Sequence, residues 1–121
     1  KFDISQNKKL VPINHLQAHL LSPRLTNDIK FPYLCLLVSG GNTALVVVKN
    51  PSKFITLGST IDDSAGECFD KVAKALGLGY PGGPAIENLA MQGDLKSFSL
   101  PMPLTKIKNC DFSFSGLKTE I

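Results

Sequence analysis

Two histidines at helical spacing are the first residues whose types could do chemistry. His15 and His19 stand four residues apart, and they are the only histidines in the chain. Side chains four residues apart lie on one face of a helix, so both imidazoles would project together. Such a pair supplies half of a four-ligand metal site, the alternative being an ordinary histidine pair. Leu16 follows His15, so the glutamate of a zinc-protease H-E-x-x-H motif is missing.

A glycine pair at Gly40-Gly41 is the second feature with chemical potential. Two successive glycines are expected to give the backbone positive φ, and they remove the side chains that would keep a ligand from peptide N–H groups. Ser39 and Thr43 add hydroxyls on either side. We expect a tip that can hold a phosphate or carboxylate, the alternative being a plain turn.

Two acidic residues have more than one interpretation. Asp70 could pair with Lys74 four residues on, which the residue pattern alone favours, or it could accept hydrogen bonds from sugar hydroxyls. Glu87 would face the same way as Gly83 in a later helix, or it is a solvated helix residue. The amides of Gly82 and Gly83, at that helix N-terminus, suit an adenosine or a phosphate.

Two further motifs are rejected on their context. Gly77, Gly79 and Gly82 match the dinucleotide-binding pattern G-x-G-x-x-G, but they follow a predicted helix rather than a strand. Ser115 and Lys118 match the S-x-x-K nucleophile motif, whose companion motifs are absent. We therefore interpret Ser115 as a helix-capping residue.

The elements that must position these residues are read from the apolar pattern. Residues 34–38 and 44–48 read as a hairpin, and 53–57 as a third strand, which together make an antiparallel meander. Asn14 can cap a helix over 15–21, and a weak strand ends near 11–13.

The second half of the chain is predicted to be mostly helical. An apolar stripe indicates a helix over 62–76, with Asp62 and Asp63 in its first turn and Gly77 closing it. Gly66 inside this helix costs about 1 kcal/mol relative to Ala, which close approach of a neighbouring backbone or ligand would offset.

Beyond that helix we expect a second helix over 84–91. Residues 93–110 read as irregular, with an edge strand around Phe98 and Leu100. A further helix is expected to start near residue 115.

Composition bounds the class of protein. The chain has 121 residues and a net charge of +3, which fits one domain or a piece of one and neither requires nor excludes RNA contact. Of its three cysteines, Cys35 and Cys68 lie in apolar patterns and are expected to be buried thiols in a reducing cytosol. No run is long enough to span a membrane. The start at Lys1 leads us to expect an excised fragment.

Six motifs, in this order, resemble the TsaD/Gcp family of tRNA N6-adenosine threonylcarbamoyltransferases, formerly labelled O-sialoglycoprotein endopeptidases. They are His15–His19 (HLQAH), Leu37–Gly41 (LVSGG), Ile61–Glu67 (IDDSAGE), Phe69–Ala73 (FDKVA), Gly77–Pro84 (GLGYPGGP) and Asp111–Thr119 (DFSFSGLKT). The resemblance implies a partial α/β fold of the actin-like, hexokinase/Hsp70-type ATPase class. Residues 1–32 would end its first half with the histidine helix, and 33–121 would begin its second half with the glycine hairpin.

The resemblance also implies an activity and a site. It implies transfer of the threonylcarbamoyl group from ATP-derived threonylcarbamoyl-AMP to N6 of adenosine 37 in tRNAs that read codons starting with A. His15 and His19 match the metal ligands, which implies one divalent metal per subunit, Fe²⁺ or Zn²⁺. The positions that match substrate-binding residues are Leu37, Val38, Ser39, Gly40, Gly41, Asp70, Gly83 and Glu87. No residue is assigned as catalytic, and Asn42 stands where the family usually has histidine.

The resemblance finally implies partners and a location. These are tRNA, an actin-like paralogue subunit and a P-loop ATPase subunit in the cytoplasm, with no membrane. The fragment alone is expected to be inactive and could self-associate through its sheet edge. The alternatives are a catalytically silent actin-like nucleotide-binding scaffold and a metalloendopeptidase.

Overall fold

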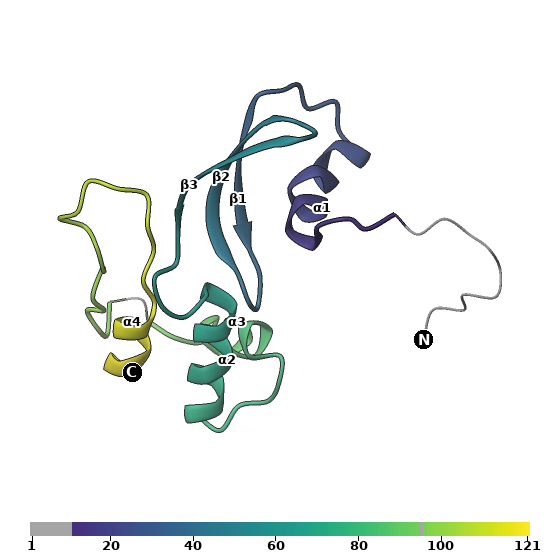
Figure 1. Cartoon of the computed structure of the whole chain (residues 1–121). Helices are drawn as coiled ribbons and strands as arrows, with labels where there is room; N and C mark the ends of the chain where they lie inside the picture. Colours follow the sequence, from purple (N-terminus) through teal and green to yellow (C-terminus); the bar gives the residue numbers. More distant parts are fainter. Residues whose placement is uncertain (1–10, 95) are drawn as a thin grey trace.

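The computed structural model describes residues 11–94 and 96–121 as a small antiparallel sheet with helices packed beside it and at one end (Figure 1). The strands are β1 (Tyr33–Val38), β2 (Thr43–Asn50) and β3 (Lys53–Ser59). They pair in the order β1-β2-β3, so the predicted three-strand meander is confirmed.

The first helix, α1 (His15–Leu21), has the bounds that the sequence predicts. Oδ1 of Asn14 accepts hydrogen bonds from the backbone N–H groups of Leu16 and Gln17 at 3.0 and 3.1 Å, which confirms the predicted cap. A short 3₁₀ helix, η2 (Ser22–Leu25), follows. Residues 11–13 are not in a strand, and the rest of the strand predicted there lies outside the described residues.

One face of the sheet packs against α1. Leu20 of α1 is buried together with Val46 and Val48 of β2, and Val48 is fully buried. The Tyr33 hydroxyl donates a 2.7 Å hydrogen bond to the carbonyl of Leu20, which fixes β1 against the helix. The end of α1 is therefore held on the sheet by apolar packing and one partly buried hydrogen bond.

The opposite face of β1 is exposed. Leu34, Leu36 and Val38 are 59%, 57% and 53% exposed, and they alternate with the half-buried residues of the strand. Because side chains alternate between the faces of a strand, β1 is apolar on both faces. β1 also lies at an edge of the sheet, and self-association through this edge stays a prediction.

The central helix, α2 (Ala65–Ala75), begins three residues later than predicted. Ser64 is its N-cap, and the Ser64 hydroxyl accepts a 3.2 Å hydrogen bond from the N–H of Glu67. Asp62 and Asp63 therefore precede the helix, and their predicted place in its first turn is wrong. Gly77 follows the helix at φ +70°, which confirms the predicted end.

The remaining helices are α3 (Gly82–Ala90) and α4 (Ser115–Glu120). α3 starts two residues before the predicted Pro84. Pro84 fits within the first turn of α3, because the backbone N–H groups there, which proline lacks, have no hydrogen-bond partner within the helix. The edge strand predicted around Phe98 and Leu100 is wrong: these side chains are 84% and 49% exposed and lie in irregular chain.

The end of β3 contacts the segment that leads into α4. Thr60 and Phe112 form a parallel bridge, and Asp111 Oδ1 accepts a 3.1 Å hydrogen bond from the N–H of Ser59. A Cβ on Gly58 would stand 2.0 Å from the carbonyl oxygen of Cys110, so this approach requires glycine. Within the described ranges, no helix has the length and apolar character to cross a membrane.

Candidate functional site

The hairpin tip, residues 39–42, closes through its own backbone and one hydroxyl. The N–H of Ser39 donates to the carbonyl of Asn42 at 2.8 Å, and the N–H of Asn42 donates to Ser39 Oγ at 3.0 Å. Gly40 and Gly41 do not have positive φ, so that prediction is wrong. A Cβ built on either glycine meets nothing within 4 Å, and both residues are exposed at the tip.

The hairpin tip rests on the first turn of α2. A Cβ on Gly66 would stand 2.7 Å from Gly40 Cα and 2.7 Å from the Ser39 carbonyl oxygen. This contact confirms the expectation that a close neighbouring backbone accounts for glycine at position 66.

Two buried hydroxyls fasten this contact, and sequence reasoning missed their role. Ser64 Oγ donates to the carbonyl of Gly40 at 2.7 Å, and Thr43 Oγ1 accepts from the N–H of Ala65 at 2.9 Å. Ser64 and Thr43 are only 1% and 4% exposed. The Ser-x-x-Glu pattern that ends at Glu67 could have indicated Ser64 as a helix cap.

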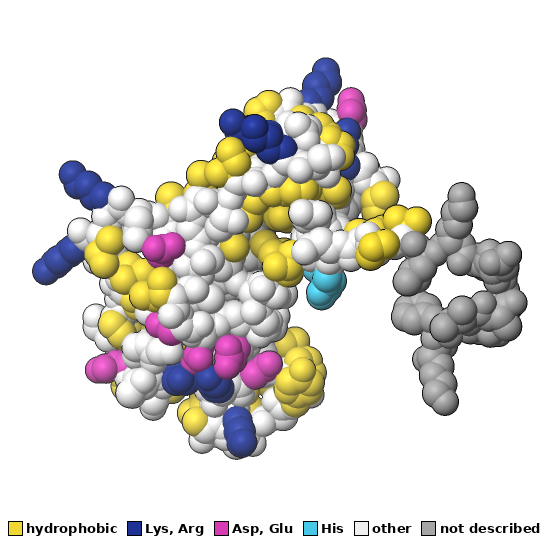
Figure 2. Space-filling view, viewed as in Figure 1, with side chains coloured by type: hydrophobic (Ala, Val, Ile, Leu, Met, Phe, Trp, Pro, Cys, Tyr) yellow, Lys and Arg dark blue, Asp and Glu magenta, His cyan; other side chains and the backbone are white. Residues whose placement is uncertain are grey.

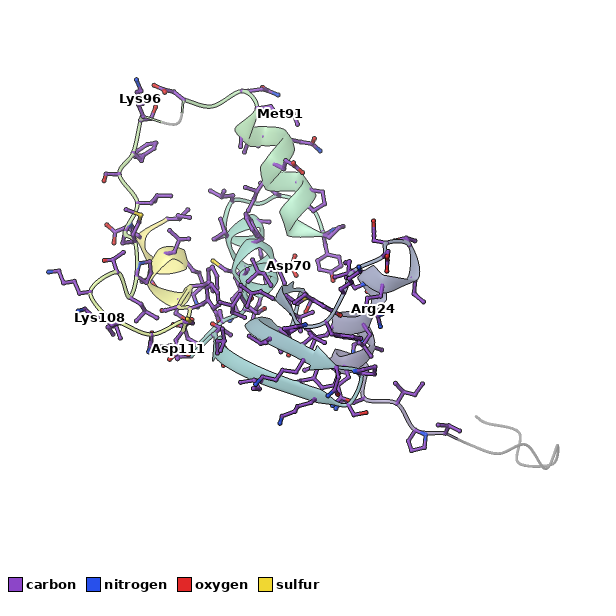
Figure 3. The ribbon with its side chains drawn as sticks, turned by 90° about the horizontal axis from the view of Figure 1, so that it is seen from above. Arg24, Asp70, Met91, Lys96, Lys108 and Asp111 are labelled. Carbon is purple, nitrogen blue, oxygen red and sulfur yellow. The ribbon has the colours of Figure 1, made fainter. Side chains whose placement is uncertain are left out.

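Asp70 lies four residues beyond Gly66 on α2, hence on the same helix face. Its Oδ1 accepts a 2.8 Å hydrogen bond from the N–H of Gly82, where α2 and α3 meet (Figure 3). No ion pair joins Asp70 to Lys74, so the pairing favoured by the residue pattern is wrong. The Gly82 N–H is thus occupied, whereas a Cβ on Gly83 would meet nothing within 4 Å.

The predicted substrate-binding residues line neighbouring hollows rather than one pocket. Gly83 and Glu87 share a cavity of about 440 Å³, which confirms that they face the same way. Asp70 lines another of about 320 Å³ with Lys74 and Tyr80. The hairpin tip and the start of α3 both pack against α2. The described residues do not form a single pocket that would enclose a ligand.

The histidine pair lies on the exposed side of α1, with His15 as its first residue and His19 in its last turn (Figure 2). The Nε2 atoms of His15 and His19 are 2.8 Å apart. Leu16, next to His15, lines a cavity of about 420 Å³ with Leu37 and Gly41. The start of α1 therefore neighbours the glycine hairpin, as the proposed site requires.

The two histidines fit a metal ion in part. Their Nε2 atoms converge as two ligands of one ion must, and imidazole suits both Zn²⁺ and Fe²⁺. No group of three His, Cys, Asp or Glu residues able to hold a metal forms within 11–94 and 96–121. Two ligands are too few for a tetrahedral site, so further ligands would have to come from elsewhere.

Asp63 connects α2 to α4. Its carboxylate, 12% exposed, pairs with Lys71 at 2.7 Å and with Lys118 at 2.8 Å. The hydrogen bonds from Lys118 and then Lys71 lower the pKa of Asp63 below its ordinary value. Because the Lys118 ammonium group is held in the ion pair with Asp63, it is not placed to activate the Ser115 hydroxyl as a nucleophile.

Asp62 caps α4 in place of the predicted Ser115. Asp62 Oδ1 accepts from the N–H groups of Phe114 and Ser115 at 2.7 and 3.3 Å, and its Oδ2 accepts from the hydroxyl of Ser113. Phe114 is the N-cap residue and gives no side-chain cap. Partial burial raises the pKa of Asp62, but these hydrogen bonds outweigh it and leave the pKa lowered.

Comparison with known proteins gives consistent matches over this chain. The family described as "TsaD: tRNA N6-adenosine threonylcarbamoyltransferase" matches residues 1–121. A protein of that name from Maricaulis maris is 53% identical over 116 residues, covering 96% of this chain and 31% of the relative. Namesakes from Methylorubrum populi and Brucella ovis are 56% and 54% identical, covering 94% and 98% of this chain and 33% of each relative.

The extent of these matches decides what they show. The family match covers every residue of the chain, whereas the chain spans only about a third of the length of the curated relatives it matches. The chain belongs to the TsaD family of tRNA N6-adenosine threonylcarbamoyltransferases.

Proposed function

We propose that the whole protein transfers the threonylcarbamoyl group from threonylcarbamoyl-AMP to N6 of adenosine 37 in tRNAs that read codons starting with A. It would act as an acyltransferase: the adenine amine attacks the carbamoyl carbonyl, an N–C bond forms, and the C–O bond to AMP breaks. The match to this family over residues 1–121 carries the proposal.

The geometry supports assigning a different part of the substrate to each group of proposed substrate-binding residues. Backbone N–H groups at the exposed tip residues Gly40 and Gly41 would stabilise negative charge that develops on the transferred group or phosphate. Asp70 has Oδ1 engaged by Gly82, and its Oδ2 accepts no hydrogen bond from the described residues, so Oδ2 can accept one from a ribose hydroxyl. Glu87 would hold the ribose from α3 beside Gly83. Leu37, Val38 and Ser39 complete the hairpin side of the proposed site.

The proposed metal ion, Fe²⁺ or Zn²⁺, would be held by His15 and His19 together with ligands from elsewhere in the whole protein. When bound, it would supply Lewis acidity toward an oxygen of the substrate. The role of this chain in that chemistry would be to keep two imidazoles convergent on α1, beside the hairpin.

The wider setting belongs to the same proposal. The meander and its helices would form part of an actin-like fold, with residues 1–32 ending one half and 33–121 beginning the other. The partners would be tRNA, an actin-like paralogue subunit and a P-loop ATPase subunit, in the cytoplasm.

The test is transfer by the whole protein with its synthesis partners, threonylcarbamoyl-AMP and tRNA, followed by mass analysis of the tRNA nucleosides. We expect threonylcarbamoyladenosine with the wild type, and strongly reduced amounts with His15→Ala and Asp70→Ala. Lys53→Ala, in the exposed turn before β3, serves as the control. No product with the wild type would refute the activity, and full activity of both variants would refute the site.

A further inference from the structure

We propose that Gly66 and Ser64 are positioning residues for the transfer reaction. They fix the hairpin tip on the first turn of α2 and thereby set the distance between the Gly40-Gly41 peptides and the carboxylate of Asp70. This inference rests on the proposed function. Neither residue needs to touch a substrate.

The first support is steric. The hairpin tip lies so close to α2 that a Cβ on Gly66 would be 2.7 Å from both Gly40 Cα and the Ser39 carbonyl oxygen. Both neighbours are backbone atoms, so a methyl group could be admitted only by moving the hairpin itself. The absence of a side chain at position 66 therefore determines how near the hairpin tip approaches α2.

The second support is the hydrogen bonding of Ser64. Its buried hydroxyl donates to the Gly40 carbonyl at 2.7 Å and accepts from the N–H of Glu67 at 3.2 Å. One oxygen thus joins the hairpin tip to the α2 backbone. The bond from the N–H of Ala65 to Thr43 Oγ1, at 2.9 Å, holds the same two elements together on the other side of the tip.

The third support is the position of Asp70. It lies one turn beyond Gly66 on the same face of α2, about 6 Å along the helix axis. Its hydrogen bond to the N–H of Gly82 fixes the start of α3 there, and a Cβ on Gly82 would stand 2.6 Å from Asp70 Cα. One rigid helix therefore carries both the hairpin tip and α3, and any shift of the tip is a shift relative to Asp70.

The principal test is Gly66→Ala in the whole protein. Alanine has the higher helix propensity, so a role confined to forming α2 predicts unchanged or improved stability and unchanged transfer. Displacement of the tip predicts a fall in kcat, of about 100-fold for a shift of about 1 Å, with a smaller change in KM for threonylcarbamoyl-AMP. Gly116→Ala in α4 is the matched control, since its Cβ would meet nothing within 4 Å, and it should leave kcat unchanged.

A second pair of variants applies even if Gly66→Ala fails to fold. Ser64→Ala removes both hydrogen bonds and should lower kcat about tenfold, as expected for losing about 1.4 kcal/mol of transition-state stabilisation. Ser64→Thr keeps the hydroxyl at the N-cap and should restore kcat. Ser64→Val, which has nearly the bulk of threonine but no hydroxyl, should not restore kcat.

The outcomes separate this inference from the proposed function. If the wild type transfers and folded Gly66→Ala or Ser64→Ala transfers at the same kcat, the positioning role is refuted while the function stands. The positioning role is also refuted if the loss of activity equals the loss of folded protein, or if only KM changes. If the wild type gives no product, the function fails and the inference fails with it.

Discussion

Asp70 Oδ1 accepts a hydrogen bond from the backbone N–H of Gly82 at 2.8 Å, which ties the middle of α2 to the first residue of α3. The carboxylate is therefore oriented by the protein before any ligand arrives. A binding group whose position is fixed in this way is preorganised, which reduces the entropy lost on binding. Asp70 thus has a structural bond and a proposed ligand bond on different oxygens.

Substitution of Asp70 should separate these two bonds. Asp70→Asn keeps an oxygen for the buried Gly82 N–H but loses the negative charge, so we expect a loss of stability of at most about 1 kcal/mol. Affinity for AMP should fall about fivefold, since hydrogen bonds to charged groups are worth about 1 kcal/mol more than neutral ones. Thermal unfolding and calorimetric titration of the whole protein with AMP would measure both.

Asp70→Ala should do more damage to the fold. It leaves the Gly82 N–H without its partner, which costs about 1–3 kcal/mol when the group is buried, so the melting temperature should fall below that of Asp70→Asn. Equal stability of the two variants would show that the bond to Gly82 contributes nothing. Unchanged AMP affinity of Asp70→Asn would exclude Asp70 from the ribose site.

If His15 and His19 are metal ligands, replacing either one should lower the metal content of the whole protein. In the whole protein, His15→Ala and His19→Ala should each lower bound Fe²⁺ or Zn²⁺ by at least about tenfold, as expected when one ligand of a four-ligand site is lost. Metal analysis after dialysis would measure this. Gln17→Ala, between the two histidines on the same helix, is the control and should bind metal like the wild type. Full metal content in both histidine variants would exclude them as ligands.

The carboxylate of Asp63 makes a prediction about acid stability. Lys118 and Lys71 lower the pKa of this carboxyl in the folded protein, so its stabilising effect is fully present above the ordinary Asp pKa of about 3.9. The effect is lost as the pH falls through the lower folded pKa, because protonation removes the charge that both lysines pair with. Asp63→Asn should therefore lower the melting temperature at pH 7, and its difference from the wild type should shrink as the pH falls below about 3.9.

The acid prediction has a matched control on the same helix. Lys74→Met removes a lysine that forms no ion pair within the described residues, so its melting temperature should match the wild type over the same pH range. If Asp63→Asn melts like the wild type at pH 7, the connection from α2 to α4 through Asp63 does not stabilise the protein.

The cysteines should differ in reactivity. Burial raises the pKa of the Cys68 thiol, which also donates a 3.6 Å hydrogen bond to the Phe114 carbonyl, whereas Cys110 is exposed. Since the thiolate is the reactive form, Cys110 should be alkylated at pH 7.5 well before Cys68. Peptide mass mapping of the whole protein during iodoacetamide treatment would measure both rates. Equal rates would contradict the burial of Cys68.

Much of the fold was predictable because its signals are local. The apolar runs around Gly40-Gly41 indicate the hairpin, Asn14 marks the start of α1, and Gly77 marks the end of α2. The start of α2 was misplaced because the periodic stripe continues back to Ile61, while the helix begins at the capping serine, Ser64. Ile61 fits the helical spacing but does not face the core, since it is 65% exposed, so the stripe alone does not mark where the helix begins.

The long-range contacts could not be predicted from spacing. Asp62 caps a helix more than fifty residues away, and Asp70 bonds to Gly82 rather than to Lys74. Such partners depend on how the elements fold back on one another. The local pattern offered Ser115 as the α4 cap because a serine at a helix start is a common cap. Only Gly66 signalled a tertiary contact in advance, through its poor fit to a helix interior.

The most direct test of the central claim is a titration of the whole protein, labelled with ¹⁵N-glycine, with AMP. If the hairpin tip, Asp70 and the start of α3 surround one nucleotide, the amide signals of Gly40, Gly41 and Gly83 shift together with a single dissociation constant. Those of Gly93 and Gly116 stay in place. Shifts confined to glycines away from the tip and α3, or different dissociation constants for Gly41 and Gly83, would contradict a shared site.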